Sequence, residues 1–176
     1  MFDRNILFYP GPFALQQAAL PIVRRNIMDS KTTVQTLMDS IQKADFEKAK
    51  SLLSADFKFS GPVPEPINGE AWLGMSKSLK KAFPDLEYNF KVEGMTGDTA
   101  NVSAKLQGTH RGEFDLTNMH MGVIPATNKS FAAAQEHGII TVKGDKVISW
   151  ANNPTEGAGL KAILDQLGVK VPTPTM

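Results

Sequence analysis

The stretch LEYNFKVEGMTGDTANVSAKL, residues 86–106, alternates apolar and polar side chains on both sides of a turn. The apolar residues before the turn are Leu86, Tyr88, Phe90 and Val92. A period of two places such residues on one face of a β-strand and leaves the intervening polar residues on the other face. Thr96-Gly97-Asp98 supplies the turn, and the alternation resumes at Asn101. The stretch therefore predicts two antiparallel strands with one solvated face.

Helical patterns precede these strands, and further strands follow them. Apolar residues at helical spacing predict three helices, and Ser30, Asp45 and Asn68 are the residues expected to cap them. Pro84 ends the third helix, and a short strand over 57–60 comes before it. The remaining predicted elements are a hairpin over 130–153 around Gly144-Asp145 and a final helix over 160–167. This order, with helices first, four long antiparallel strands next and a helix last, favours an α+β fold over alternating βαβ units.

The length of the chain and the change in its sequence pattern near residue 28 predict a single domain. A chain of 176 residues has the usual size of one domain. Residues 1–27 show no sustained helical period and end in Arg24-Arg25, so we interpret them as an irregular extension. They are either poorly ordered or a start assigned too early, with a presequence as the alternative. The domain is expected over 28–171, followed by a loose tail over 172–176.

The composition disfavours several function classes. Lys and Arg number 19 and Asp and Glu number 18, so the net charge is +1 and no basic face for nucleic acid is expected. No apolar run has the length of a membrane span, so no membrane partner is expected. With 0 Cys, the chain holds no disulfide, thiol nucleophile or thiolate metal site. A basic pair that follows the apolar residues is the reverse of a secretory signal, so we expect a cytoplasmic protein.

Two short patterns are not interpreted as cofactor or metal sites. GAGLKA, residues 157–162, matches a dinucleotide fingerprint, but neither a second strand nor a distal acidic residue follows it. Its glycines are interpreted as the start of a helix. His120 lies between Met119 and Met121, and thioether and imidazole groups suit copper, but no His-rich cluster supports them. We therefore expect no cofactor and no metal.

Several runs of the sequence, in order, resemble one family. They are AFPDL at 82–86, GD at 97–98, GTHRGEF at 108–114, VKGDKVISW at 142–150 and ILDQLG at 163–168. Over about residues 30–171 the chain resembles the SnoaL-like polyketide cyclases of the nuclear transport factor 2-like superfamily. The resemblance implies a cone-shaped, curved antiparallel sheet wrapped on N-terminal helices, a cystatin-like α+β barrel whose open end is a natural pocket. This fold hosts cyclases, isomerases, epoxide hydrolases and non-catalytic ligand binders.

The sequence departs from the family pattern at two places. The loop after Phe114 is longer than the family's usual link, and the insert, Asp115 to Ile124, is placed to roof the pocket or to reach a partner. In the cyclase pattern a carboxylate on the third strand acts as the acid or base. Matching from Trp150 puts His137 at that position, and matching from the turn puts Gly138 there. The aspartate is therefore absent in either register.

His137 is the first catalytic candidate. With Gly144-Asp145 as a two-residue turn, strict pairing of the hairpin predicts His137 opposite Asn152. The same face then carries Gln135 and Trp150, a mixture that is typical of a pocket with a few placed polar groups. An imidazole with an ordinary pKa of about 6.5 acts as an acid or a base near neutral pH. The alternative is a hydrogen-bonded core histidine.

Glu136, the neighbour of His137, is expected to point the other way. Successive side chains of a strand alternate between its two faces, so the two residues cannot form a dyad. We interpret Glu136 as a solvated or dimer-interface residue. If a bulge shifts the register by one residue, Glu136 replaces His137 as the inward group.

Four further residues are candidates for the pocket. His110 follows the second strand and is the second catalytic candidate, as a group that orients the substrate, and the alternative is a loop histidine. Trp72, Tyr88 and Phe59 are candidate wall residues that bind the substrate, with an ordinary core as the alternative. A buried Tyr88 needs a partner for its hydroxyl group.

Three functions remain open at this point. The first is a cofactor-free cyclase, isomerase or hydrolase that moves a proton on a small hydrophobic carbonyl compound. In that mechanism His137 exchanges the proton, Asn152 or His110 holds the oxygen, and Trp150 and Trp72 clamp the ring.

The other two functions involve no chemistry. One is a protein that holds an apolar ligand in the same cone. The other is an interaction module, and a homodimer is expected through the outer face of the sheet. The apolar residues expected on that face are Val92, Ile140, Val142 and Val147.

Overall fold

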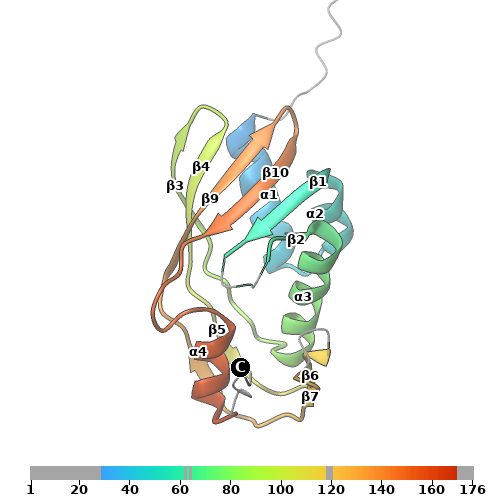
Figure 1. Cartoon of the computed structure of the whole chain (residues 1–176), viewed down its shortest axis with the longest axis vertical. Coiled ribbons are helices and arrows are strands. Elements are labelled where there is room, and N and C mark those ends of the chain that lie inside the picture. Colours follow the sequence, from blue (N-terminus) through green and yellow to red (C-terminus); the bar gives the residue numbers. More distant parts are fainter. Residues whose placement is uncertain (1–28, 62, 64, 118–120, 170–176) are drawn as a thin grey trace, which may run out of the picture.

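The structure, a computed structural model, describes residues 29–61, 63, 65–117 and 121–169 (Figure 1). The predicted extension over 1–27 and the predicted tail over 172–176 lie outside these residues, and so does His120. Within the described part of the chain, no helix is long and apolar enough to cross a membrane.

The described residues form four helices and three sheets. The helices are α1 (Ser30–Gln42), α2 (Phe46–Leu52), α3 (Gly69–Ala82) and α4 (Gly159–Leu167). The strands of the main sheet are β1 (Leu53–Ser60), β2 (Ile67–Asn68), β3 (Lys91–Thr96), β4 (Thr99–Ala104), β9 (Glu136–Lys143) and β10 (Lys146–Asn152). Two small sheets pair β5 (Gln107–Thr109) with β8 (Ser130–Ala132) and β6 (Phe114–Asp115) with β7 (Val123–Ile124). These small sheets lie at the end of the molecule that also carries α4 (Figure 1).

The arrangement confirms the predicted α+β fold with a curved antiparallel sheet. The strand order is β2-β1-β10-β9-β4-β3, and every neighbouring pair is antiparallel except β1 with β10, which is parallel. In the described residues the sheet is open, with β2 and β3 at its edges, and does not close into a complete barrel. Helix α1 crosses one face of the sheet, and α3 packs beside β1 (Figure 1).

Short polar side chains begin the first three helices. Asp45 and Asn68 each accept a hydrogen bond from a backbone N–H in the first turn of α2 and α3, at 3.0 and 2.9 Å, as predicted. Asp29 takes this role in α1, and Ser30 is the first helical residue and not the cap. The prediction for α1 is therefore wrong by one residue.

A bulge in the β9–β10 hairpin decides which side chains of β9 face the helices. Pairing next to the turn is as predicted, but the register shifts by one residue at Ile148, which is the extra residue on β10. Beyond the bulge Asn152 pairs with Gly138 and not, as predicted, with His137. Glu136 therefore faces inward and is 7% exposed, whereas His137 faces outward.

The same register buries side chains that were expected on the outer face of the sheet. Ile140, Val142 and Val147 belong to the core at 2% exposure or less, and Val92 packs against that core. The expectation that these four residues form an apolar outer face is wrong, because they lie on the face of the sheet that packs against the helices. Ile139, which is 41% exposed, lies on the outer face instead. The homodimer itself stays a prediction.

Candidate functional site

A cavity of about 120 Å³ lies between the inner face of the main sheet, α3 and α4. Helix α3 contributes Trp72, Met75 and Leu79 to its wall, and α4 contributes Leu160 and Ile163. The polar groups on the wall belong to Ser76, Tyr88, Glu136 and Asn152. Among the described residues that line the cavity there is no Lys or Arg. The wall is therefore mostly apolar and carries few places where a ligand can form hydrogen bonds.

Aromatic rings form one side of this cavity. The ring of Trp72 packs against three others, Phe57 at 5.5 Å, Phe59 at 6.1 Å and Trp150 at 5.4 Å between centroids. Rings at these distances hold each other in place. The residues predicted to bind a ligand that the structure brings to the cavity are Phe59, Trp72, Tyr88, Trp150 and Asn152.

Glu136 ends a chain of hydrogen bonds on the cavity wall. Trp150 Nε1 donates to Asn152 Oδ1 at 2.6 Å, and Asn152 Nδ2 donates to Glu136 Oε2 at 2.9 Å. Glu136 Oε1 accepts the backbone N–H of Gly159, the first residue of α4, at 2.7 Å. The residue before α4 gives that helix no side-chain cap, so Glu136 satisfies one of its free N–H groups. Because both of its oxygens are held, the carboxyl group has a fixed orientation.

The electrostatic setting of Glu136 differs from that of a surface carboxyl group. Burial raises the pKa of Glu136 above its ordinary value, against the opposing effect of the hydrogen bonds from Gly159 and Asn152. A raised pKa makes the carboxylate a stronger base and lets the acid keep its proton to higher pH. Perturbed carboxyl groups inside cavities are typical of acid/base sites.

The structure places His137 and Gln135 away from the cavity. The His137 side chain is 53% exposed on the outer face of the sheet, with Nδ1 3.4 Å from Glu93 Oε2. Gln135 Nε2 donates to the other oxygen of Glu93 at 3.5 Å. The expectation that His137 faces the cavity is wrong, because the bulge on β10 moves Glu136 into the inward position.

His110 is fully buried but does not line the cavity. Its ring packs 5.1 Å from that of Phe83 and 6.3 Å from that of Phe114. Nδ1 accepts the Thr127 N–H at 3.3 Å, and Nε2 has no hydrogen-bond partner among the described residues. Burial lowers the pKa of His110 below its ordinary value. The ring therefore lies in the core behind Phe114, which itself lines the cavity.

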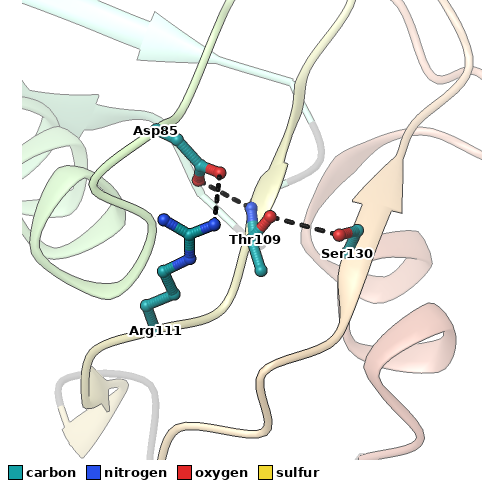
Figure 2. Close-up of polar contacts among 4 residues, drawn as sticks. All are labelled: Asp85, Thr109, Arg111 and Ser130. Carbon is teal, nitrogen blue, oxygen red and sulfur yellow. Dashed lines mark hydrogen bonds and ion pairs between the residues drawn. The ribbon is translucent and has the colours of Figure 1, made fainter.

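The family-like runs AFPDL and GTHRGEF bind each other at the surface (Figure 2). Asp85 Oδ1 accepts the Thr109 N–H at 2.7 Å, and Asp85 Oδ2 lies 4.0 Å from Arg111 Nη2. Thr109 Oγ1 lies 3.1 Å from the hydroxyl group of Ser130 on β8. None of these four residues lines the cavity. The two runs therefore hold a loop against the end of α3 and have a structural role in this chain.

Residues that could hold a metal ion are not assembled in the described structure. Within residues 29–61, 63, 65–117 and 121–169, no group of three His, Asp or Glu side chains comes together as a metal site. Gly159 of the GAGLKA run begins α4 and donates to Glu136, so it serves the cavity wall.

Comparison with known proteins identifies one family. The model of the SnoaL-like polyketide cyclase family matches residues 31–153. No curated protein matches the sequence.

Solved structures resemble the chain over most of its length. IdmH from Streptomyces antibioticus, a candidate polyketide cyclase, is 23% identical, with a TM-score of 0.61 over 80% of this chain and 99% of that chain. A candidate SnoaL-like polyketide cyclase from Jannaschia sp. CCS1 is 20% identical, with a TM-score of 0.62 over 82% and 95% of the two chains. An epoxide hydrolase from M. tuberculosis is 12% identical, with a TM-score of 0.55 over 81% and 94%. At these identities the likeness shows the fold and leaves the activity open.

Proposed function

The chain belongs to the SnoaL-like polyketide cyclase family, and from this premise we propose that it is a cofactor-free enzyme that moves a proton on a small hydrophobic carbonyl compound, with Glu136 as the acid/base group. The observation that carries the proposal is one buried carboxyl group on the wall of an otherwise largely apolar cavity. Glu136 begins β9, which is the third main-sheet strand after α3, following β3 and β4. The family pattern has its acid/base carboxylate on the third strand.

The proposed reaction begins with proton removal from the carbon next to a carbonyl group. The Glu136 carboxylate takes this proton, the C–H electron pair forms a C=C bond, and the carbonyl π electrons move to the oxygen. Where a C=C bond is conjugated with it, the resulting enolate takes the proton back from Glu136 at the far carbon of that bond. Otherwise it attacks a second carbonyl group of the same molecule, and the oxygen of that group takes the proton from Glu136. The first outcome is an isomerisation and the second is a ring closure.

The surroundings of Glu136 support this role. Asn152 and Gly159 donate to separate oxygens of the carboxylate, and each oxygen keeps a lone pair that can take a proton. Trp150 fixes the orientation of the Asn152 amide through the hydrogen bond at 2.6 Å. Glu136 is 7% exposed on a largely apolar wall, so solvent shields the base only weakly.

A non-catalytic ligand-binding protein is the second candidate function. It is favoured by the hydrogen bonds that already occupy both oxygens of Glu136, because such bonds also suit a purely structural carboxyl group. In that case Glu136 only caps α4, and the cavity holds an apolar molecule without changing it.

The substitution Glu136→Gln tests the proposed function. It keeps an oxygen that can accept the Gly159 N–H, but the amide cannot take a proton. We expect the wild-type protein to exchange the methyl protons of acetophenone with D2O. Glu136→Gln should slow this exchange by about 10²- to 10⁴-fold, measured by proton NMR.

Glu93→Gln is the matched control, because Glu93 is an exposed carboxylate on the outer face of the same sheet. It should leave the exchange rate unchanged. Equal rates in the wild type and Glu136→Gln would rule out Glu136 as the base. Binding of acetophenone to the wild type without any exchange would favour the ligand-binding function instead.

A further inference from the structure

Tyr88 carries a buried hydroxyl group that has no hydrogen-bond partner among the described residues. The residue lines the cavity and is 6% exposed. A buried phenol group normally finds a partner, since leaving a polar group unpaired in an apolar setting is unfavourable. The unpaired hydroxyl group therefore needs an explanation in terms of what the cavity binds.

The surroundings of Tyr88 hold its side chain in place. The Tyr88 N–H donates to Gln42 Oε1 at 2.8 Å, and the Tyr88 carbonyl accepts the Lys105 N–H at 2.8 Å. The ring stacks on that of Phe90 at 4.8 Å with an angle of 10° between the planes. Because the backbone and the ring are both fixed, the hydroxyl group has little freedom to turn toward another protein group.

The hydroxyl group of Ser76 lines the same cavity and opposes the rise in the pKa of Tyr88, but the two hydroxyl groups form no hydrogen bond in the structure. Ser76 Oγ donates to the Trp72 carbonyl oxygen at 3.1 Å. Burial raises the pKa of Tyr88, so its hydroxyl group keeps its proton at physiological pH. Tyr88 therefore presents a neutral O–H donor to the cavity.

We propose that the Tyr88 hydroxyl group donates a hydrogen bond to the carbonyl oxygen of a neutral, single-ring ligand in this cavity. This inference rests on the proposed function for the cavity as a ligand site, but not on proton transfer by Glu136. Tyr88 and Glu136 then provide two separate polar contacts, one for the carbonyl oxygen and one for the carbon that exchanges its proton.

The charge of the cavity selects the class of ligand. No Lys or Arg is among the described residues that line it, so a carboxylate or phosphate would enter without a counter-charge. Lys80 Nζ lies 5.6 Å from the centre of the Tyr88 ring, but it donates to the Leu86 carbonyl oxygen at 2.7 Å and does not line the cavity. A neutral carbonyl oxygen is the acceptor that fits a lone phenol donor.

The volume of the cavity selects the size of the ligand. The cavity measures about 120 Å³. An apolar protein cavity of about 150 Å³ holds a benzene molecule. The cavity is of this order and is partly open, so one ring fills it and a larger ligand would extend out of its opening.

A matched pair of ligands tests the role of Tyr88. Acetophenone and ethylbenzene have one ring and similar shapes, but only acetophenone has a carbonyl oxygen. We expect the wild type to bind acetophenone at least tenfold more tightly than ethylbenzene, measured by NMR titration. Tyr88→Phe should lose this preference and bind ethylbenzene as well as the wild type does, because a site built to form a hydrogen bond discriminates against ligands that lack the partner.

Two further measurements separate this inference from the proposed reaction and from misfolding. The infrared band of ¹³C=O-labelled acetophenone should move to lower frequency in the wild type and in Glu136→Gln, but not in Tyr88→Phe. Thr33→Val is the control variant, because Thr33 also has a buried hydroxyl group without a partner among the described residues but does not line the cavity, and it should keep the preference for the ketone. Tyr88→Phe should also melt at a higher temperature than the ligand-free wild type, because it removes an unpaired buried hydroxyl group.

The outcomes of these measurements are distinct. An unchanged ketone preference or carbonyl band in Tyr88→Phe would overturn the inference, and so would the failure of both ligands to bind. A carbonyl shift that persists in Glu136→Gln, together with no proton exchange in the wild type, would support the Tyr88 contact while rejecting the proposed reaction.

Discussion

Burial shifts the pKa values of three titratable side chains in or near the cavity toward the neutral form. It raises the pKa of Glu136 and of Tyr88, and it lowers the pKa of His110. In each case transfer out of water disfavours the charged form. These shifts make the stability of the protein depend on pH, and the contributions of His110 and Glu136 change with pH in opposite directions.

His110→Gln tests the contribution of the buried imidazole. Because the pKa of His110 is lowered in the folded state, the unfolded chain binds more protons below the ordinary value of 6.5. The stability that the neutral ring provides is present above that value and is lost as the pH falls toward the lower folded pKa. We expect the melting temperature of the wild type to fall more than that of His110→Gln between about pH 7 and about pH 5.

Glu136 provides the counterpart to this measurement. Its pKa is raised in the folded state, so its contribution is present below the ordinary value of 4.5 and is lost as the pH rises through the folded pKa. The wild type should therefore lose stability as the pH rises through this range, and Glu136→Gln should not. This is the opposite of the pH dependence expected from His110. If His110→Gln kept the wild-type slope, another group would be responsible for the acid sensitivity.

At the scale of the elements, most of the fold could be predicted from the sequence. Asp45 and Asn68 cap their helices as predicted, because a short polar side chain before an apolar helical pattern specifies a helix start locally. The family-like runs also predicted the fold correctly. In this chain the two runs AFPDL and GTHRGEF stabilise the fold by binding each other. The N–H of Gly112 donates to the Ala82 carbonyl oxygen at 2.9 Å. An added Cβ at Gly112 would lie 2.3 Å from the Lys81 carbonyl oxygen, so the close approach requires glycine.

The inward face of β9 could not be predicted in the same way. Ile139 and Ile140 are adjacent and both apolar, so alternation does not decide which of them faces the core. The turn was predicted correctly, but the bulge at Ile148 carries no local signal of its own. One extra residue on β10 moved His137 outward and Glu136 inward. On β10, Trp150 and Asn152 follow the bulge and were placed correctly, whereas Val147 precedes it and was expected outside but lies inside.

Gly138→Ala tests how closely β9 must approach β10 at the cavity. An added Cβ would lie 2.5 Å from Asn152 Oδ1 and 2.8 Å from the Ala151 carbonyl oxygen. One of these atoms belongs to the backbone, so β10 must shift and the hydrogen bond between Trp150 and Asn152 must weaken. We expect a loss of about 1–3 kcal/mol in the free energy of unfolding, measured by urea denaturation, and a change in tryptophan fluorescence.

Gly94→Ala is the control for this prediction. Gly94 lies in β3 of the same sheet, and an added Cβ there would meet nothing within 4 Å. This variant should be as stable as the wild type or slightly more stable, since alanine lowers the entropy of the unfolded chain. Equal stability of Gly138→Ala and Gly94→Ala would mean that β10 is free to move away from β9, and the fixed orientation of Asn152 would then be in doubt.

At the scale of the whole molecule, the cavity joins parts of the chain that are far apart in the sequence. Its wall includes side chains from four elements, namely Ile41 of α1, Phe59 of β1, Trp72 of α3 and Ile163 of α4. The side chains that stabilise the fold therefore also shape the cavity. Atoms that line the empty space lack the van der Waals contacts that a closely packed core would give them. The proposed ligand-binding role therefore predicts that a larger side chain in this space has opposite effects on stability and on binding.

Ala104→Leu tests whether the cavity is kept for a ligand. Ala104 lies at the end of β4, lines the cavity and pairs with Glu136 in the sheet. Leucine adds three carbon atoms, and burying them in existing space should stabilise the fold by about 2 kcal/mol. We expect a melting temperature roughly 4–8 °C above that of the ligand-free wild type, together with loss of acetophenone binding in an NMR titration.

Ala100→Leu is the matched control, because Ala100 lies on the same inner face of β4, is fully buried and does not line the cavity. The same three carbon atoms have no space there, so this variant should lose about 1–3 kcal/mol of stability. The two alanines lie on the same face of one strand, so only the location of the cavity explains why the two changes in stability have opposite signs. If both variants were destabilised to the same extent, the space beside Ala104 would be too small for a side chain, and hence too small for the ring that Tyr88 is proposed to bind.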